Sequence, residues 1–325
     1  MKHTIPVTVL LLAIFVLAQI NGLFVLDYYI DIKASALAGK TVVHQEAYDQ
    51  SNITVPVVEN ESSSFVYIII ALLLGTGLVL LIIKFRQRKI WKAWFFLSVV
   101  VTLVISLNTW MFRFLGDTEV SALTLYGITV GLCCLLAYYK VFRQNIFFHN
   151  MTEIFIYGGL GALLVPILNL ISMSIVLLVV AVYDMYAVWK SKHMIEMAQF
   201  QTDEKVFAGL YIPYERKNDG TFLVSKKRQA AQKTMKKIEV ASMAKRTTKT
   251  MNTAILGGGD VAFPLLFAGV VMKTTGSYLA PTLVVAATTV SLGLLFYYGE
   301  KGKFYPAIPF VTAGCFVGYG LFLIL

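Results

Sequence analysis

Histidine and cysteine are scarce in this chain of 325 residues, which contains only four histidines and three cysteines. The histidines stand far apart without a His-Glu-x-x-His pattern, so the sequence offers no recognisable zinc site. A Gly-x-Ser-x-Gly elbow, which marks the nucleophile of many serine hydrolases, is also missing. Cys133, Cys134 and Cys315 all fall within apolar runs, and we interpret them as packing residues. We therefore expect no metal and no cofactor.

Charged residues are also few. They make up 14% of the chain, whereas hydrophobic residues make up 58%, and mean hydropathy is +0.72. This composition excludes an ordinary soluble domain, in which about 25% of residues are charged. Nine apolar runs cover about residues 5–29, 65–83, 93–112, 119–139, 152–167, 168–189, 254–272, 277–298 and 306–325. Most can cross the roughly 30 Å hydrocarbon layer as helices. We predict an all-α polytopic membrane protein with nine transmembrane helices.

The net charge of +10 follows from the topology that these runs predict. With the amino terminus inside, all but four of the 28 lysines and arginines fall in cytoplasmic segments, the exceptions being Lys33, Lys40, Arg113 and Lys273. This bias predicts a cytoplasmic amino terminus and an external carboxyl terminus in a prokaryotic cell membrane. Membrane lipids are expected partners. Nucleic acid is not, because the basic segment lacks a recognisable fold and interleaved stacking aromatics.

The topology divides the chain into three parts. Residues 1–194 form a six-helix amino-terminal membrane part, 195–252 a hydrophilic basic cytoplasmic loop, and 253–325 a three-helix carboxyl-terminal part. His149 and Glu153 mark the inner start of the fifth helix. We expect both side chains in the membrane interface rather than in the core.

Asp184 and Asp260 are the acidic residues well inside apolar runs. Asp184 precedes Lys190 by six residues and Asp260 follows a helix start expected near Ala254, so each lies roughly 9 Å from the inner boundary. An acid at this depth is costly and indicates a functional site. Two carboxylates that share a site can hold one proton, so the ionised member activates water while the protonated one polarises a peptide carbonyl. The pair therefore predicts acid–base hydrolysis.

The same acids allow a proton- or cation-conducting channel or transporter as an alternative function. Broken helices near the midplane and an internal repeat would favour a transporter, and the sequence shows no convincing repeat. A non-catalytic membrane scaffold is a third alternative. It is disfavoured because two buried acids are an expensive way to build one.

The residues around both acids resemble the motifs of presenilin and signal peptide peptidase. The family's Tyr-Asp, GxGD and Pro-Ala-Leu motifs correspond in order to Tyr183-Asp184, Gly257-Gly258-Gly259-Asp260 and Pro306-Ala307-Ile308. The stretch Lys192-His193-Met194 is similar to archaeal presenilin homologues. The resemblance covers the carboxyl-terminal half, whereas the first four helices agree in number and hydropathy. The change from Leu to Ile at position 308 conserves volume.

The resemblance implies a presenilin-like intramembrane aspartyl protease with Asp184 and Asp260 as its catalytic pair. Tyr183, Gly257–Gly259 and Pro306–Ile308 would shape the site and contact substrate. Substrates would be single transmembrane helices that unwind locally. The orientation predicted here matches presenilin, so we expect substrates whose amino terminus lies outside. We also expect activity without an obligatory partner subunit, while cleavage of the 195–252 loop is left open.

Overall fold

The computed structural model describes residues 4–55, 58, 61–85, 87–143, 145–191, 208–215, 251–300 and 305–325. Within these ranges the chain is mainly helical, with a single two-stranded sheet. Seven helices of this part are long and apolar enough to cross a membrane. The protein is therefore a multi-pass membrane protein. The count of nine spans stays a prediction.

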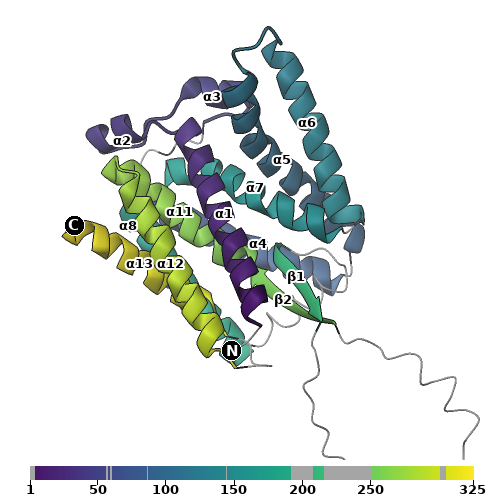
Figure 1. Ribbon diagram of the computed structural model, residues 1–325, viewed down its shortest axis with the longest axis vertical. Helices are drawn as coiled ribbons and strands as arrows, with labels where there is room; N and C mark the ends of the chain where they lie inside the picture. Colours follow the sequence, from purple (N-terminus) through teal and green to yellow (C-terminus); the bar gives the residue numbers. More distant parts are fainter. Residues whose placement is uncertain are drawn as a thin grey trace, which may run out of the picture.

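The long helices form one bundle, and the two-stranded sheet lies at one end of it (Figure 1). The amino-terminal helices are α1 (Ile5–Tyr29), α2 (Ile32–Ala38), α3 (Gln45–Gln50), α4 (Ser64–Lys84), α5 (Arg88–Leu115), α6 (Ala122–Tyr138), α7 (Ile146–Leu164) and α8 (Leu170–Tyr186). The carboxyl-terminal helices are α11 (Gly258–Thr275), α12 (Leu279–Tyr298) and α13 (Ile308–Ile324). Wider π-helical turns follow α6 at η2 (Tyr139–Arg143) and α8 at η4 (Ala187–Ser191).

Polar caps set several helix starts. The Asn145 side chain accepts from the backbone N–H of Phe147 at 2.9 Å, which starts α7, and Asn169 accepts from Ser172 at 2.9 Å, which starts α8. Such caps satisfy amide donors that have no partner within the helix. The predicted boundary between the apolar runs 152–167 and 168–189 is thereby confirmed, since α7 ends at Leu164 and α8 begins at Leu170.

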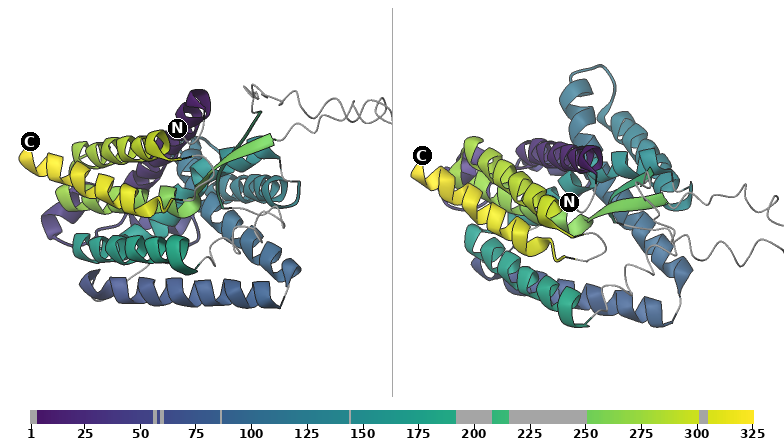
Figure 2. Two further views of the ribbon diagram at one scale, coloured as in Figure 1. Left: turned by 90° about the horizontal axis from the view of Figure 1, so that it is seen from below. Right: turned by 60° about the horizontal axis from the view of Figure 1, so that its bottom comes forward.

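Helix α1 lies at the centre and packs against α5, α7, α11 and α12, whereas α4 lies at the outer edge beside α8 (Figures 1 and 2). Small residues allow the closest approaches. A Cβ at Gly159 in α7 would stand only 1.9 Å from the Thr102 carbonyl oxygen of α5. A Cβ at Gly318 in α13 would stand 2.5 Å from Val284 Cα of α12. These two glycines therefore let α7 approach α5, and α13 approach α12, more closely than residues with side chains would.

The predicted start of the seventh helix near Ala254 is wrong. The chain there forms strand β2 (Met251–Gly257), which pairs antiparallel with β1 (Gly209–Glu215), and α11 begins only at Gly258. Asp260 therefore lies in the first turn of α11 rather than six residues inside a helix. The fold is accordingly not purely helical.

The local sequence explains why this segment is a strand. β1 supplies hydrogen-bond partners along β2, β-branched residues such as Ile255 favour extended backbone, and the glycine run is a poor helix former. Leu210 and Ile212 of β1, with Leu256 of β2, bury one face of the hairpin in the main core. Strand β2 therefore ends at Gly257, and α11 begins at the next residue.

Candidate functional site

Asp184 lies near the carboxyl end of α8, and only 5% of its surface is exposed. The backbone N–H of Ile308, the first residue of α13, donates to Asp184 Oδ2 at 3.3 Å. Amides at a helix start favour a neighbouring anion, so α13 presents a suitable partner to this carboxylate. The neighbouring Tyr183 is 39% exposed.

Asp260 follows the three glycines, and its carboxylate lies close to them. A Cβ built at Gly257 would stand 3.2 Å from Asp260 Oδ2. Gly257 is the last residue of β2 and the N-cap of α11. A carboxylate in the first turn of a helix is favoured by the helix dipole. The absence of a side chain at position 257 thus leaves room for the Asp260 carboxylate.

Ile308 links the two halves of this site. Its N–H contacts Asp184, and its Cδ1 would lie 3.8 Å from a Cβ at Gly259, directly before Asp260. Helices α8, α11 and α13 pack against one another. Pro306 is buried, and Ala307 is the N-cap of α13. The structure therefore brings Ile308 into contact with Asp184 and close to Gly259, whereas the roles of Pro306 and Ala307 in the site stay predictions.

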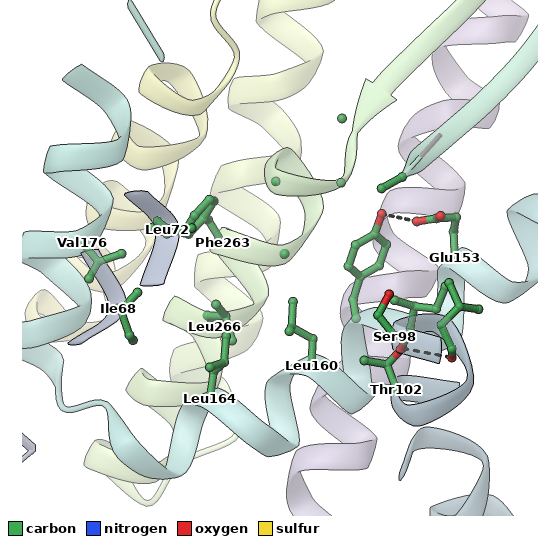
Figure 3. A pocket seen from close by; sticks show the side chains of 18 of the residues that line it. Ile68, Leu72, Ser98, Thr102, Glu153, Leu160, Leu164, Val176, Phe263 and Leu266 are labelled. Carbon is green, nitrogen blue, oxygen red and sulfur yellow. Dashed lines mark hydrogen bonds between the residues drawn. The ribbon is translucent and has the colours of Figure 1, made fainter. Parts of the chain in front are cut away.

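A cavity of about 620 Å³ opens beside the glycine run, between α4, α5, α7, α8 and α11. Figure 3 shows its lining, in which Phe263 and Leu266 of α11 and Val176 of α8 present apolar side chains. Glu153 and Tyr157 of α7 stand at its polar end, near Gly258. A cavity of this volume accommodates several apolar side chains.

Glu153 is buried, which corrects the expectation that it lies in the membrane interface. Its side chain is 2% exposed and pairs with Lys140 Nζ, whose side chain is 1% exposed. Lys140 was counted with the cytoplasmic basic residues, and it too is buried. The second Glu153 oxygen accepts a hydrogen bond from the Tyr157 hydroxyl, drawn as a dashed line in Figure 3. Burial is tolerated because each charge is compensated.

Sequence reasoning missed this polar cluster at the site. Glu153 and Tyr157 are four residues apart and hence on one helix face, a spacing that could have indicated their contact. Lys140 gives no such signal, because it precedes the turn that leads into α7. Among the described residues, no group of three or more His, Cys, Asp or Glu side chains could hold a metal ion.

The chain is similar to a known protein family and to solved structures. The family model described as signal-peptide peptidase, presenilin aspartyl protease matches residues 29–325. Two crystal structures of a presenilin family intramembrane aspartate protease are similar to the chain. The form in space group C222 has a TM-score of 0.52 at 14% identity and covers 97% of each chain. The form in P2 has a TM-score of 0.50 at 16% identity, covering 94% of this chain and 96% of the other. No curated protein sequence matches significantly.

Proposed function

Because the chain belongs to the signal-peptide peptidase and presenilin aspartyl protease family, we propose that Asp184 and Asp260 are its catalytic pair. The family membership makes the protein an intramembrane aspartic-type endopeptidase. The observation that carries the proposal is the position of Ile308, whose amide binds Asp184 while its side chain lies beside Gly259.

The proposed reaction is acid–base hydrolysis without a covalent intermediate. One carboxylate takes a proton from water, and the protonated partner donates a hydrogen bond to the scissile carbonyl. The water oxygen then bonds to the carbonyl carbon. As the C–N bond breaks, the carboxyl group that took the proton from water gives it to the departing nitrogen. Asp184 is oriented for this role by the Ile308 amide, and Asp260 by the first turn of α11.

The proposed substrate is a transmembrane helix that unwinds near the two acids. Gly257–Gly259 carry no side chains, so an extended substrate backbone can approach them closely. Among the described strands β2 pairs only with β1, and its other edge offers main-chain groups to an extended peptide. The neighbouring cavity of about 620 Å³ would receive the apolar side chains of the substrate. Tyr183, Pro306 and Ala307 complete the proposed contacts.

The proposal also covers the membrane in which the enzyme acts and the orientation of the chain and its substrates. The enzyme acts in the cell membrane of a prokaryote as a single chain in contact with lipid, and it prefers substrates whose amino terminus lies outside. The charge bias predicts this orientation, with the amino terminus cytoplasmic and the carboxyl terminus outside.

A cleavage assay with the purified full chain in liposomes and a transmembrane peptide tests the catalytic pair. Asp184→Asn and Asp260→Asn should each lower kcat by about 10²–10⁴-fold, the usual contribution of acid–base catalysis. Asp27→Asn is the matched control, because Asp27 pairs with the partly exposed Arg113 in another part of the protein and should leave cleavage intact. Full cleavage by either site variant overturns the pair. Ion flux without cleavage by the wild-type protein would favour the channel alternative.

A further inference from the structure

We propose that Tyr157 is a positioning residue that fixes the backbone at Gly258 and thereby the direction of the Asp260 side chain. The inference rests on the proposed function of Asp260. The Tyr157 hydroxyl oxygen lies 3.3 Å from the Cβ position at Gly258, so the phenol packs directly against that residue.

The Tyr157 hydroxyl that lies beside Gly258 is itself held by a buried charge pair. The hydroxyl donates to Glu153 Oε2, and Glu153 Oε1 accepts from Lys140 Nζ. Both charged side chains are at most 2% exposed. Because the phenolic proton is already donated to Glu153, Tyr157 has no proton to give to a reacting peptide. Its contribution is to hold the turn in place.

A second path of contacts connects Lys140 to Gly258, by way of His149 and strand β1. His149 Nδ1 lies 3.4 Å from Lys140 Nζ, and His149 Nε2 lies 2.7 Å from the Gly209 carbonyl oxygen of β1. One residue earlier, the carbonyl of Ala208 accepts from the N–H of Gly258 at 3.1 Å. The contacts therefore form a closed ring that holds Gly258 through its backbone N–H and places the Tyr157 hydroxyl against its Cβ position.

One residue of this ring needs an unusual backbone conformation. Gly209 has φ of 135°, a region that side chains with a Cβ rarely adopt. Its carbonyl, which contacts His149, is therefore directed by a conformation that favours glycine. The ring thus depends on local backbone geometry at β1 as well as on buried charge.

The position of the ring predicts which step Tyr157 affects. Tyr157 and Gly257–Gly259 line one end of the same cavity, so the phenol forms part of the wall beside the catalytic turn. Loss of the Tyr157 hydroxyl would let the backbone at Gly258, and with it Asp260, move relative to a bound peptide. We expect slower chemistry and less uniform cleavage positions, with substrate binding little changed.

The first test is Tyr157→Phe in the full-length enzyme. kcat should fall about ten- to a hundredfold, as expected for a small misplacement of a reacting group. KM should stay within about twofold, because ground-state contacts are kept. Mass spectrometry should show cleavage at additional neighbouring bonds. Tyr48→Phe is the matched control: Tyr48 is a buried phenol whose hydroxyl donates to the Ala162 carbonyl at 2.8 Å, and its loss should lower Tm without changing kcat or cleavage position.

The second test is a double-mutant cycle with Gly258→Ala. In the wild-type background the new Cβ would meet the Tyr157 hydroxyl at 3.3 Å, whereas Tyr157→Phe removes that oxygen. The rate lost through Gly258→Ala should therefore be at least about threefold smaller in the Tyr157→Phe background, because contacting residues are not additive. If the losses of kcat from the two substitutions simply add, Tyr157 is not a positioning residue. The same follows if Tyr157→Phe keeps the wild-type kcat and cleavage positions; either result leaves the proposed function standing. Cleavage by Asp260→Asn would overturn the proposed function as well.

Discussion

The backbone N–H of Ile308 donates to Asp184 Oδ2 at 3.3 Å, where α13 begins. Because the donor belongs to the main chain, the hydrogen bond survives a change of side chain at position 308. The side chain contacts the other half of the site instead, with its Cδ1 3.8 Å from the Cβ position at Gly259. Ile308 therefore has two separate roles. Its main chain contacts Asp184, and its side chain packs beside Gly259, next to Asp260.

Ile308→Leu should preserve activity and Ile308→Ala should not. Leucine conserves the volume beside Gly259, so kcat should stay within about threefold of wild type. Alanine keeps the N–H but removes the packing, and kcat should fall about ten- to a hundredfold through the loosened site. Single-turnover cleavage of a transmembrane peptide measures both. An inactive Ile308→Leu enzyme would show that side-chain shape, rather than volume, decides the contact.

The first and third glycines before Asp260 should differ in their tolerance of alanine. A Cβ at Gly257 would stand 3.2 Å from Asp260 Oδ2, whereas the nearest atom to a Cβ at Gly259 is a Phe263 ring carbon at 3.6 Å. Gly257→Ala would displace the carboxylate, so its kcat should fall by about a hundredfold. Gly259→Ala makes an ordinary contact and should retain more activity. Initial cleavage rates under saturating substrate compare the two.

The control for this pair is Gly75→Ala in α4. Nothing lies within 4 Å of its Cβ position, so activity should not change. Alanine in a helix interior is favoured over glycine by about 1 kcal/mol, and the Tm should stay the same or rise. Equal losses of kcat for Gly257→Ala and Gly259→Ala would contradict the role of the space beside the Asp260 carboxylate.

The sequence identifies most of the helices and the motifs of the site, because apolar runs and residue types are local signals. In the structure Ile308 of the Pro-Ala-Leu-like motif contacts Asp184 of the Tyr-Asp motif, while their roles in catalysis stay predictions. The strand before Asp260 could not be predicted in the same way. Its apolar residues continue without a break into α11, and its partner β1 lies across a long hydrophilic stretch, so hydropathy alone favours one helix over 254–272.

The buried charges were missed for a related reason. Lysine and glutamate are mostly exposed, so Lys140 is assigned to a cytoplasmic segment and Glu153 to the membrane interface when each is considered alone. Their burial depends on pairing between η2 and α7, because the two opposite charges compensate each other. Such a tertiary contact leaves no pattern in a single sequence.

The pairing predicts a strong effect on stability. Lys140→Met leaves Glu153 buried without its counter-charge and should lower the free energy of unfolding by about 3–5 kcal/mol. Combining Lys140→Met with Glu153→Leu removes both charges and should recover most of that loss. kcat should stay low in the double variant, because Tyr157 has lost its acceptor. Unfolding in micelles, followed by circular dichroism, and the cleavage assay measure the two properties separately.

Lys89→Met is the matched control for this pair, because Lys89 is an exposed lysine at the start of α5. Its substitution should change the free energy of unfolding by no more than about 0.5 kcal/mol. If Lys140→Met were equally harmless, the charge pair would contribute nothing to stability. If the double variant were less stable than Lys140→Met alone, the uncompensated charge would not be the cause of the loss.

The orientation of the chain can be measured with single cysteines. Leu37 in α2 is 91% exposed and should face outside, while Glu300 follows α12 and should face the cytoplasm. Cys133, Cys134 and Cys315 are first replaced by alanine so that no native thiol reacts. In intact cells a membrane-impermeant maleimide should label Leu37→Cys and not Glu300→Cys, and both should react in detergent. The reverse pattern would overturn the cytoplasmic amino terminus. It would also remove the basis for a preference for substrates whose amino terminus lies outside.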